Sequence, residues 1–370
     1  MHMRRNKIPV MVTGVGGGGH GEQILKALRM AETSYEIVGC DMSPYSKGLK
    51  EVDYPYVVPS ARDPRYIDTI IDLCRKHNVK ALFHGSEPEL LTMSRNRRKF
   101  LDEGIFLPIN PEHVIETCMS KSKTFQFLAE HGFPYLKTSV VKAPEDLDDW
   151  SWVPAILKPS IGSGGSAHTF IAQTKEELKV FAKYMLTSKL CPEIIVQEYK
   201  GTPETEFTVG VLFDMNGVFL NSIAVRRDLR SSLSCRTRVV NRTGLPEFGR
   251  YLSISTGVSQ GEVGPFPEVA VPCEKIARAL GPCGTINIQC RVHQGELYVF
   301  EINPRFSGTT SLRAIVGYNE PDILIRKHVL GENILPRFPY KTGVVLRGLA
   351  ETLFEKDDVA RISMMSEDTR

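Results

Sequence analysis

The sequence predicts an α/β protein that begins with a Rossmann-like parallel sheet and continues into a larger part with mixed strands and helices. Strand and helix patterns alternate between residues 8 and 84, which is typical of a small parallel sheet covered by helices. A second glycine-rich segment, residues 161–166, directly follows a strand pattern. Two adjacent apolar runs between residues 284 and 305 end in amide, carboxylate and guanidinium side chains. Together these three observations predict the α/β fold class.

The individual elements follow from hydrophobic periodicity and from the residues that start and stop helices. Before the proline-rich stretch 108–111 we expect strands at residues 8–13, 35–41 and 80–84, and helices at 22–31 and 66–77. Beyond it we expect helices at 121–132 and 174–186, the second with Thr174 as N-cap. The strands expected in this part are residues 155–159, 169–172, 193–199, 206–214 and 218–225, the last two joined by an Asn216-Gly217 hairpin turn.

The first glycine-rich turn has two interpretations. Gly14, Gly16 and Gly19 match the G-x-G-x-x-G pattern of dinucleotide-binding folds, and Asp41 ends the second strand where such folds place a ribose-binding acid. A nicotinamide-dependent oxidoreductase is therefore one alternative. A strand-to-helix turn, however, also requires glycine for backbone reasons alone.

The second glycine-rich segment is a candidate phosphate site. Lys158 ends a strand, and Gly162, Ser163, Gly164 and Gly165 follow it. An ammonium group and successive backbone N–H groups can converge there on one anion. No Gly-Lys-Ser/Thr follows, so the segment is not a P-loop, and a mobile hairpin tip is the alternative. Lys121, which opens a helix, is a candidate second cation, although a solvated surface lysine is common.

The strand at residues 193–199 ends in a polar corner, Glu198-Tyr199-Lys200. Such a corner offers a carboxylate and backbone groups to an adenine edge. Glu206, or alternatively Glu204, is a candidate acceptor for ribose hydroxyls. Without context these acids are equally well explained as solvent-facing strand residues.

The two apolar runs near the carboxyl end predict a metal site. Glu301 and Asn303 are two residues apart, so in a strand they point to the same side. One carboxylate with neighbouring amide oxygens suits Mg²⁺ whose remaining ligands are phosphate oxygens and water. Gln289 joins them only if the turn around residues 293–295 has an odd number of loop residues, which we expect. A hairpin with one polar face in solvent is the alternative.

Composition limits the classes of function. At 370 residues the chain is long enough for two or three domains, and 42% hydrophobic with 24% charged residues indicates a globular protein. A net charge of +3, with the basic residues dispersed, argues against a nucleic-acid partner. No run approaches the roughly 20 apolar residues of a membrane span. Eight cysteines without a C-x-x-C pair and the lack of a signal-peptide pattern favour a cytoplasmic protein.

Taken in order, these motifs resemble the ATP-grasp superfamily, in particular ligases similar to the synthetase component of carbamoyl phosphate synthase. The motifs are residues 158–160 with 162–165, 198–200 with 206–209, and 287–289 with 301–305. The resemblance implies an α+β grasp: a Rossmann-like pre-ATP-grasp sheet followed by a two-lobed ATP-grasp fold. The implied domains are residues 1–115 for the first, 116–198 for the small lobe with the phosphate loop, and 199–370 for the large lobe with the metal and substrate site. The glycine turn at residues 14–19 then does not indicate a dehydrogenase.

The resemblance also implies roles for the candidate residues. Lys121, Lys158 and the loop at 162–165 would contact the phosphates of ATP, the corner at 198–200 the adenine, and Glu206 the ribose. Gln289, Glu301 and Asn303 would hold Mg²⁺, with Mn²⁺ as a substitute, and Gln289 would also contact the nucleotide. Arg305 would meet the carboxylate or the acyl phosphate. Ser120-Lys121 stands where the family often has an acid before the cation, so the role of Lys121 is less well supported.

The implied reaction joins a small-molecule carboxylate, activated as an acyl phosphate, to an amine, with release of ADP and phosphate. A single grasp unit without an amidotransferase segment argues against carbamoyl phosphate synthesis itself. A phosphotransferase that stops at the phosphorylated acid is a second alternative. A homodimer is compatible with the habit of the family.

An arginine-rich stretch between the hairpin and the metal strands is the candidate site for an anionic acceptor, and a loose basic loop is the alternative. Its arginines are Arg226, Arg227, Arg230, Arg236, Arg238 and Arg242. Arg226 ends a strand and is the leading candidate, so that Arg305, Arg226 and Lys158 are the expected catalytic cations. His84, Glu87 and Glu89 face the same cleft if the carboxyl edge of the first sheet points there, although helix-capping acids explain this loop better.

Overall fold

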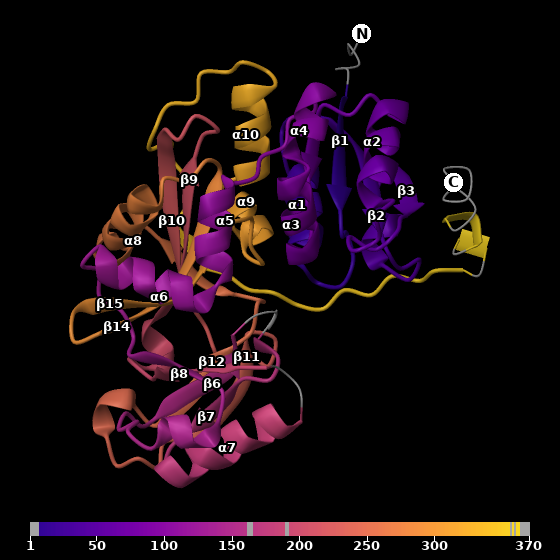
Figure 1. Ribbon diagram of the computed structural model, residues 1–370. Helices are drawn as coiled ribbons and strands as arrows, with labels where there is room; N and C mark the ends of the chain where they lie inside the picture. The colour runs from indigo at the N-terminus through magenta and orange to yellow at the C-terminus, as the bar shows by residue number, and fades with distance from the viewer. Residues whose placement is uncertain (1–6, 161–165, 189–191, 356, 359, 363–370) are drawn as a thin grey trace.

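The structure is a computed structural model, and it describes residues 7–160, 166–188, 192–355, 357–358 and 360–362. The loop predicted at residues 162–165 lies outside the described residues. The described chain has an N-terminal parallel sheet, a central antiparallel sheet and a separate small lobe (Figure 1). No helix among these residues is long and apolar enough to cross a membrane.

The N-terminal sheet is parallel, as predicted, and has the strand order β3-β2-β1-β4. Its strands are β1 (Ile8–Thr13), β2 (Tyr35–Asp41), β3 (Tyr54–Val57) and β4 (Ala81–Phe83). Sequence reasoning missed β3, an edge strand that contains Pro55, and proline is tolerated in a sheet chiefly at an edge. The helices around this sheet are α1 (His20–Arg29), α2 (Tyr66–Lys76), α3 (Glu87–Arg95) and α4 (Arg97–Asp102).

The small lobe contains an antiparallel sheet of order β5-β8-β6-β7. Its elements are β5 (Thr138–Val141), β6 (Ala155–Pro159), β7 (Phe170–Ala172), α7 (Lys175–Thr187) and β8 (Ile194–Glu198). The predicted N-cap of α7 is present, because the Thr174 hydroxyl accepts a hydrogen bond from the Glu177 N–H. Helix α7 shares an apolar core with this sheet. The two-stranded ribbon of β11 (Cys235–Val240) and β12 (Tyr251–Ser255) packs against the same sheet through a second apolar cluster.

The central sheet has the order β15-β14-β9-β10-β13-β16. Its strands are β9 (Glu206–Phe213), β10 (Phe219–Arg227), β13 (Gly261–Gly264), β14 (Thr285–His293), β15 (Glu296–Asn303) and β16 (Gly343–Val345). Every residue of β9 is buried, because helices cover both faces of this sheet. These helices are α5 (Glu112–Met119), α6 (Lys121–Glu130) and α8 (Pro267–Leu280) on one side, and α9 (Thr310–Ile315) and α10 (Glu320–His328) on the other.

Helices α9 and α10 lie between the central sheet and the N-terminal domain (Figure 1). One apolar core contains residues of β1 and α1 together with Leu312, Ile323 and Leu324 of these two helices. Tyr35 in β2 donates a 2.6 Å hydrogen bond to Asp322 in α10, both of them buried. The N-terminal sheet is thus anchored to the central sheet. The domain limits at residues 115 and 198 stay a prediction.

The hairpin of β14 and β15 corrects the predicted turn. The loop has two residues, Gln294 and Gly295, both with positive φ, rather than an odd number. A two-residue loop alone would place Phe300 opposite Gln289. Because the register shifts between Gln289 and Cys290, Gln289 instead pairs with Glu301. The predicted pairing is therefore present, but a β-bulge produces it and the turn does not.

Candidate active site

A cleft of about 1140 Å³ is lined by residues from the N-terminal domain, the small lobe and the central sheet. Most of the predicted site residues line it: Lys121, Lys158, Glu198, Tyr199, Lys200, Glu206, Gln289, Glu301, Asn303 and Arg305. They come from sequence positions as far apart as 121 and 305. The fold therefore brings together the separate motifs noted in the sequence.

Glu301, Asn303 and Gln289 lie next to one another in the cleft. The Gln289 amide nitrogen donates a 2.5 Å hydrogen bond to the Glu301 carboxylate, and Arg305 donates a 3.0 Å hydrogen bond to the Asn303 amide oxygen. Among the described residues there is no group of three or more His, Cys, Asp or Glu side chains suited to a metal. Any cation here would depend on one carboxylate, amide oxygens and oxygens of a ligand, which is how Mg²⁺ is held beside phosphates.

The orientation of Gln289 is set by Arg227, which sequence reasoning did not single out. Arg227 donates a 3.3 Å hydrogen bond to the Gln289 amide oxygen, which turns the amide nitrogen towards Glu301. In this arrangement Gln289 positions the Glu301 carboxylate. To serve as a metal ligand, Gln289 would have to share its oxygen with Arg227.

Lys158 is buried at the floor of the cleft. Its ammonium group donates hydrogen bonds of 3.0 Å to the Gln197 side chain and 3.3 Å to the backbone carbonyl of Phe300. The second contact links the small lobe to the bulge of the β14–β15 hairpin. Burial, with the nearby charge of Lys121, lowers the pKa of Lys158 to about 7, although Glu301 acts in the opposite direction. An anion at this point would restore the charged form.

The polar corner after β8 is held by internal contacts. Glu198 accepts a 2.8 Å hydrogen bond from the Lys137 N–H and lies 3.3 Å from the Lys200 ammonium. The Tyr199 hydroxyl accepts a hydrogen bond from the Ser253 N–H, and the Arg291 guanidinium lies 4.4 Å from the ring centroid. The side chain of Tyr199 therefore joins the corner to β12. A role for this corner in binding adenine stays a prediction.

Glu206 is fully buried between two arginines. Its carboxylate lies 2.9 Å from Arg227 and 2.7 Å from Arg291. Burial by itself raises the pKa of Glu206, but the charges of Arg291 and Arg227 outweigh this effect and the pKa is lowered. Because both carboxylate oxygens accept from arginines, a ribose hydroxyl would have to compete with charge-assisted hydrogen bonds. The alternative acid, Glu204, is exposed and does not line the cleft.

The arginine-rich stretch is arranged differently from the expectation. Arg226 is exposed, pairs with Glu262 and does not line the cleft, which argues against the predicted acceptor role. Successive strand residues point to opposite faces, so its neighbour Arg227 is the buried one. Three others have partners that do not line the cleft: Arg230 with Asp228, Arg238 with the ring of Tyr251, and Arg242 with Glu177. Of this stretch, Arg236 lines the cleft.

The loop after β4 contributes one acid to the cleft. Glu87 lines it and accepts a 2.6 Å hydrogen bond from Arg305. Glu89 is buried and is held by Tyr66 and Ser86, so it has a structural role. His84 is buried and lies 3.2 Å from His20, which lines the cleft. Burial and the charge of Arg305 lower the pKa of His84 to about 3, so the ring is neutral.

The first glycine turn lacks a free ribose-binding acid. The Asp41 carboxylate accepts hydrogen bonds of 3.0 Å from the N–H groups of Gly16 and Ser43. A Cβ at Gly16 would lie 2.3 Å from the Ser46 hydroxyl, so this glycine is required by packing. Asp41 and Gly16 thus stabilise their own loop, which supports the structural interpretation of the turn.

Comparison with known proteins agrees with this architecture. Residues 12–108 match the family described as "PylC-like, N-terminal domain", and residues 255–349 match "ATP-grasp in the biosynthetic pathway with Ter operon". The L-amino acid ligase from Bacillus licheniformis has a TM-score of 0.59 at 16% identity, over 88% of this chain and 74% of that one. The biotin carboxylase domain of the Hydrogenobacter thermophilus 2-oxoglutarate carboxylase, solved with MgADP, has a TM-score of 0.58 at 17% identity, over 89% of this chain and 70% of that one. The chain therefore has the ATP-grasp fold, and its N-terminal part is similar to the PylC-like N-terminal domain.

Within this class, the curated relatives include carbamoyl phosphate synthase large chains. The protein from Methanocorpusculum labreanum is 25% identical over 79% of this chain and 26% of the relative. The protein from Pyrococcus furiosus is 26% identical over 80% of this chain and 27% of the relative. This chain spans about a quarter of the length of these relatives.

Proposed function

We propose that the protein is an ATP-dependent ligase that joins a small-molecule carboxylate to an amine. The observation that carries the proposal is the grouping of Glu301, Asn303 and Arg305 in the same cleft as the buried ammonium of Lys158. The ATP-grasp fold and the ligases among the structural neighbours support the same class of reaction.

The donor set of the cleft fits Mg²⁺ with a nucleotide. Glu301 and Asn303 would hold the cation, Gln289 would orient Glu301, and phosphate oxygens and water would complete the coordination. Bound Mg²⁺ would neutralise charge on the phosphates during transfer. Mn²⁺ has similar ligand preferences and is proposed as a substitute.

The reaction would proceed in two displacements. The carboxylate oxygen of the acid attacks the γ-phosphorus, the bond to the β-phosphate oxygen breaks, and ADP leaves. The amine nitrogen then attacks the acyl carbon, phosphate departs and the nitrogen loses a proton. Lys158 and Arg305 supply positive charge at the transferring phosphoryl group and need no covalent step of their own.

The alternatives make different demands on the cleft. A phosphotransferase would use the same cations and stop after the first displacement. An oxidoreductase would need Asp41 for a ribose, and the carboxylate of Asp41 is already bound by its own loop. The ligase and the phosphotransferase therefore remain as the two functions to separate by experiment.

Release of ADP in the presence of MgATP separates them. Pairs of carboxylates and amines should give ADP only when both are present, with formation of an amide product detected by mass spectrometry. Release with the acid alone, without amide, would assign the phosphotransferase. If no pair or single acid stimulated ADP release, the proposal would fail. Solution mass by light scattering would test the proposed homodimer, for which a structural neighbour described as a dimer is the support.

A further inference from the structure

The N-terminal wall of the cleft carries two arginines that no described residue engages. Arg62 lies in the loop between β3 and α2, and Arg95 ends α3; both are exposed and both line the cleft. Within the described residues, neither guanidinium has a hydrogen bond, an ion pair or a ring contact. Outside those residues, only 367–368 carry acidic side chains.

Every other arginine of the described chain has a partner for its guanidinium group, with the exception of Arg236, which also lines the cleft. They contact carboxylates, backbone carbonyls or aromatic rings. Examples are Arg29 with Asp53, Arg65 with Asp63, Arg75 with Glu103, Arg97 with the Ile109 carbonyl, Arg98 with Asp102, and Arg278 with the ring of Phe219. The arginines without a partner are therefore gathered in the cleft and are not scattered over the surface.

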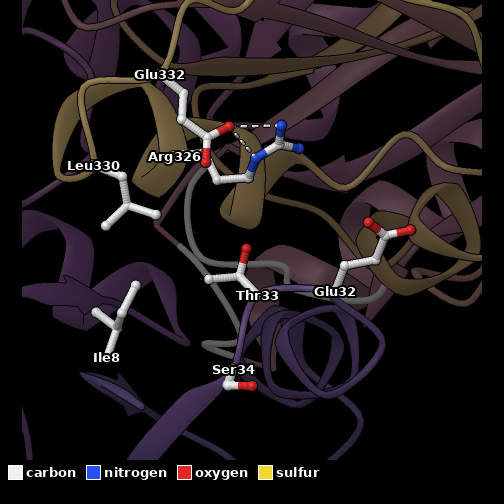
Figure 2. A pocket seen from close by; sticks show the side chains of 7 residues that line it. All are labelled: Ile8, Glu32, Thr33, Ser34, Arg326, Leu330 and Glu332. Atoms are coloured by element: carbon white, nitrogen blue, oxygen red, sulfur yellow. Dashed lines mark hydrogen bonds and ion pairs between the residues drawn. The ribbon is translucent and has the colours of Figure 1, made fainter. Parts of the chain in front are cut away.

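A second cavity of the protein shows the contrast. It has a volume of about 460 Å³ and lies between the start of β1, residues 32–34 and the end of α10. Its arginine, Arg326, is paired with Glu332 at 2.7 Å, and Figure 2 shows this pair on one side of the pocket. Among its described lining residues, that cavity offers no uncompensated positive charge, whereas the N-terminal wall of the cleft does.

The length of α3 separates Arg62 and Arg95 from the proposed catalytic residue Arg305. Thr92 in α3 donates a 3.0 Å hydrogen bond to the Ala61 carbonyl, which ties the segment of Arg62 to the helix turn before Arg95. Glu87, bonded to Arg305, lies at the other end of α3. Eight residues of helix correspond to about 12 Å along its axis. The wall therefore runs from the reaction centre to the two arginines.

Among the described residues that line it, this wall also has open space and no free acid. Gly17 and Gly18 line the cleft, and a Cβ added at either would meet no atom within 4 Å. The carboxylate of Glu87 is neutralised by Arg305. A ligand lying along the wall would thus have open space beside the glycines and two guanidinium groups to bind.

We propose that one of the two joined molecules carries an anionic group, a carboxylate or a phosphate, on the order of 10 Å from its reacting end. Arg62 and Arg95 bind this group by charge-assisted hydrogen bonds, for which the planar guanidinium is well suited. This inference rests on the proposed ligase reaction for the identity of the reacting end. The binding of the anionic group does not depend on turnover.

Calorimetric titration of the full chain with MgADP tests the proposal. The probes are α,ω-dicarboxylates of increasing length, ω-phosphono acids and ω-amino acids, with monocarboxylates and monoamines of the same lengths as the references. We expect one dianionic acid, or an ω-amino acid of matching length, to bind about tenfold more tightly than the matched monocarboxylate or monoamine. The phosphono acids distinguish a phosphate site from a carboxylate site. Preference for the ω-amino acids would place the anionic group on the amine substrate.

Three variants complete the experiment. Arg62→Ala and Arg95→Ala should each remove most of the tenfold preference, and 0.5 M salt should weaken it in the wild type. Arg98→Ala, which removes an exposed arginine paired with Asp102 outside the cleft, should leave the preference unchanged. An equal affinity for charged and neutral tails, or a preference that survives both cleft variants, would overturn the inference. The absence of ADP release with every substrate pair would instead refute the ligase reaction, whatever the binding result.

Discussion

Arg305 donates a 2.6 Å hydrogen bond to Glu87 and thereby connects the end of the β14–β15 hairpin to the first turn of α3 in the N-terminal domain. The same guanidinium group donates to Asn303 at 3.0 Å. The N-terminal domain thus takes part in positioning the candidate catalytic arginine. This relationship spans 218 residues of sequence.

Replacing Glu87 by Gln should therefore lower the rate of the reaction. Without its charged partner, Arg305 can move away from the proposed position of the transferring phosphoryl group. A misplacement of a catalytic group by about 1 Å costs about 10- to 100-fold in kcat. Steady-state kinetics of ADP release measures the effect. Glu103→Gln, which breaks an exposed ion pair with Arg75, is the matched control and should retain the wild-type rate. A Glu87 variant as active as this control would show that Arg305 needs no support from α3.

Replacing Glu301 by Gln should raise the Mg²⁺ concentration needed for half-maximal activity by about tenfold or more, because the cleft loses the carboxylate of its proposed metal site. Titration of activity with Mg²⁺ at constant ATP measures this change. Asn303→Asp restores one negative charge at the neighbouring position, and combined with Glu301→Gln it should recover part of the affinity. Unchanged Mg²⁺ dependence in Glu301→Gln would remove Glu301 from the metal site.

Nucleotide binding should be coupled to proton uptake by Lys158. In the free protein the pKa of Lys158 is about 7, so the ammonium is partly deprotonated at neutral pH. A bound phosphate favours the charged form and raises this pKa. The affinity for ADP should therefore fall as the pH rises above 7, by at most about tenfold per unit.

Calorimetry in buffers of different ionisation enthalpy measures the proton uptake directly. At pH 7 we expect about half a proton per nucleotide. Lys158→Arg keeps a permanent charge, so its nucleotide affinity should vary little between pH 7 and pH 9 from this source. The same pH dependence in wild type and Lys158→Arg would assign the titration to another group.

Glu206→Gln should destabilise the fold strongly. The substitution leaves Arg227 and Arg291 buried without a counter-charge, which costs about 3–5 kcal/mol in the free energy of unfolding. Denaturant unfolding followed by circular dichroism measures the loss. The control, Glu262→Gln, breaks the exposed pair with Arg226 and should change the stability by less than about 1 kcal/mol. Similar stabilities for the two variants would show that Glu206 is free to serve a ligand.

Several predictions from the sequence agree with the structure. The strand at residues 155–159 and the N-cap at Thr174 depend on neighbouring residues in the chain, and both are present. The spacing of Glu301 and Asn303 within one strand is likewise a local property. The order of the motifs along the chain was sufficient to indicate the ATP-grasp fold. Each motif could be located from the sequence because it lies next to a strand with a clear apolar pattern.

Other features depended on contacts between distant segments. The bulge beside Gln289, rather than the turn, sets its pairing with Glu301, and no residue of the turn signals it. Arg226 and Arg227 are adjacent and chemically identical. Arg227 points to the face where it lies 2.9 Å from the buried Glu206 carboxylate, whereas Arg226 points to the opposite face and pairs with the exposed Glu262.

The sequence by itself thus determined the order of the elements, the parallel N-terminal sheet and the chemical types gathered near the carboxyl ends of the strands. These features follow from hydrophobic periodicity and turn residues, which depend only on neighbouring positions in the chain. Only the tertiary structure decided which charged side chains pair with each other and which remain available in the cleft. Pairing depends on distances of a few ångströms between elements that are far apart in the chain, such as Glu87 and Arg305.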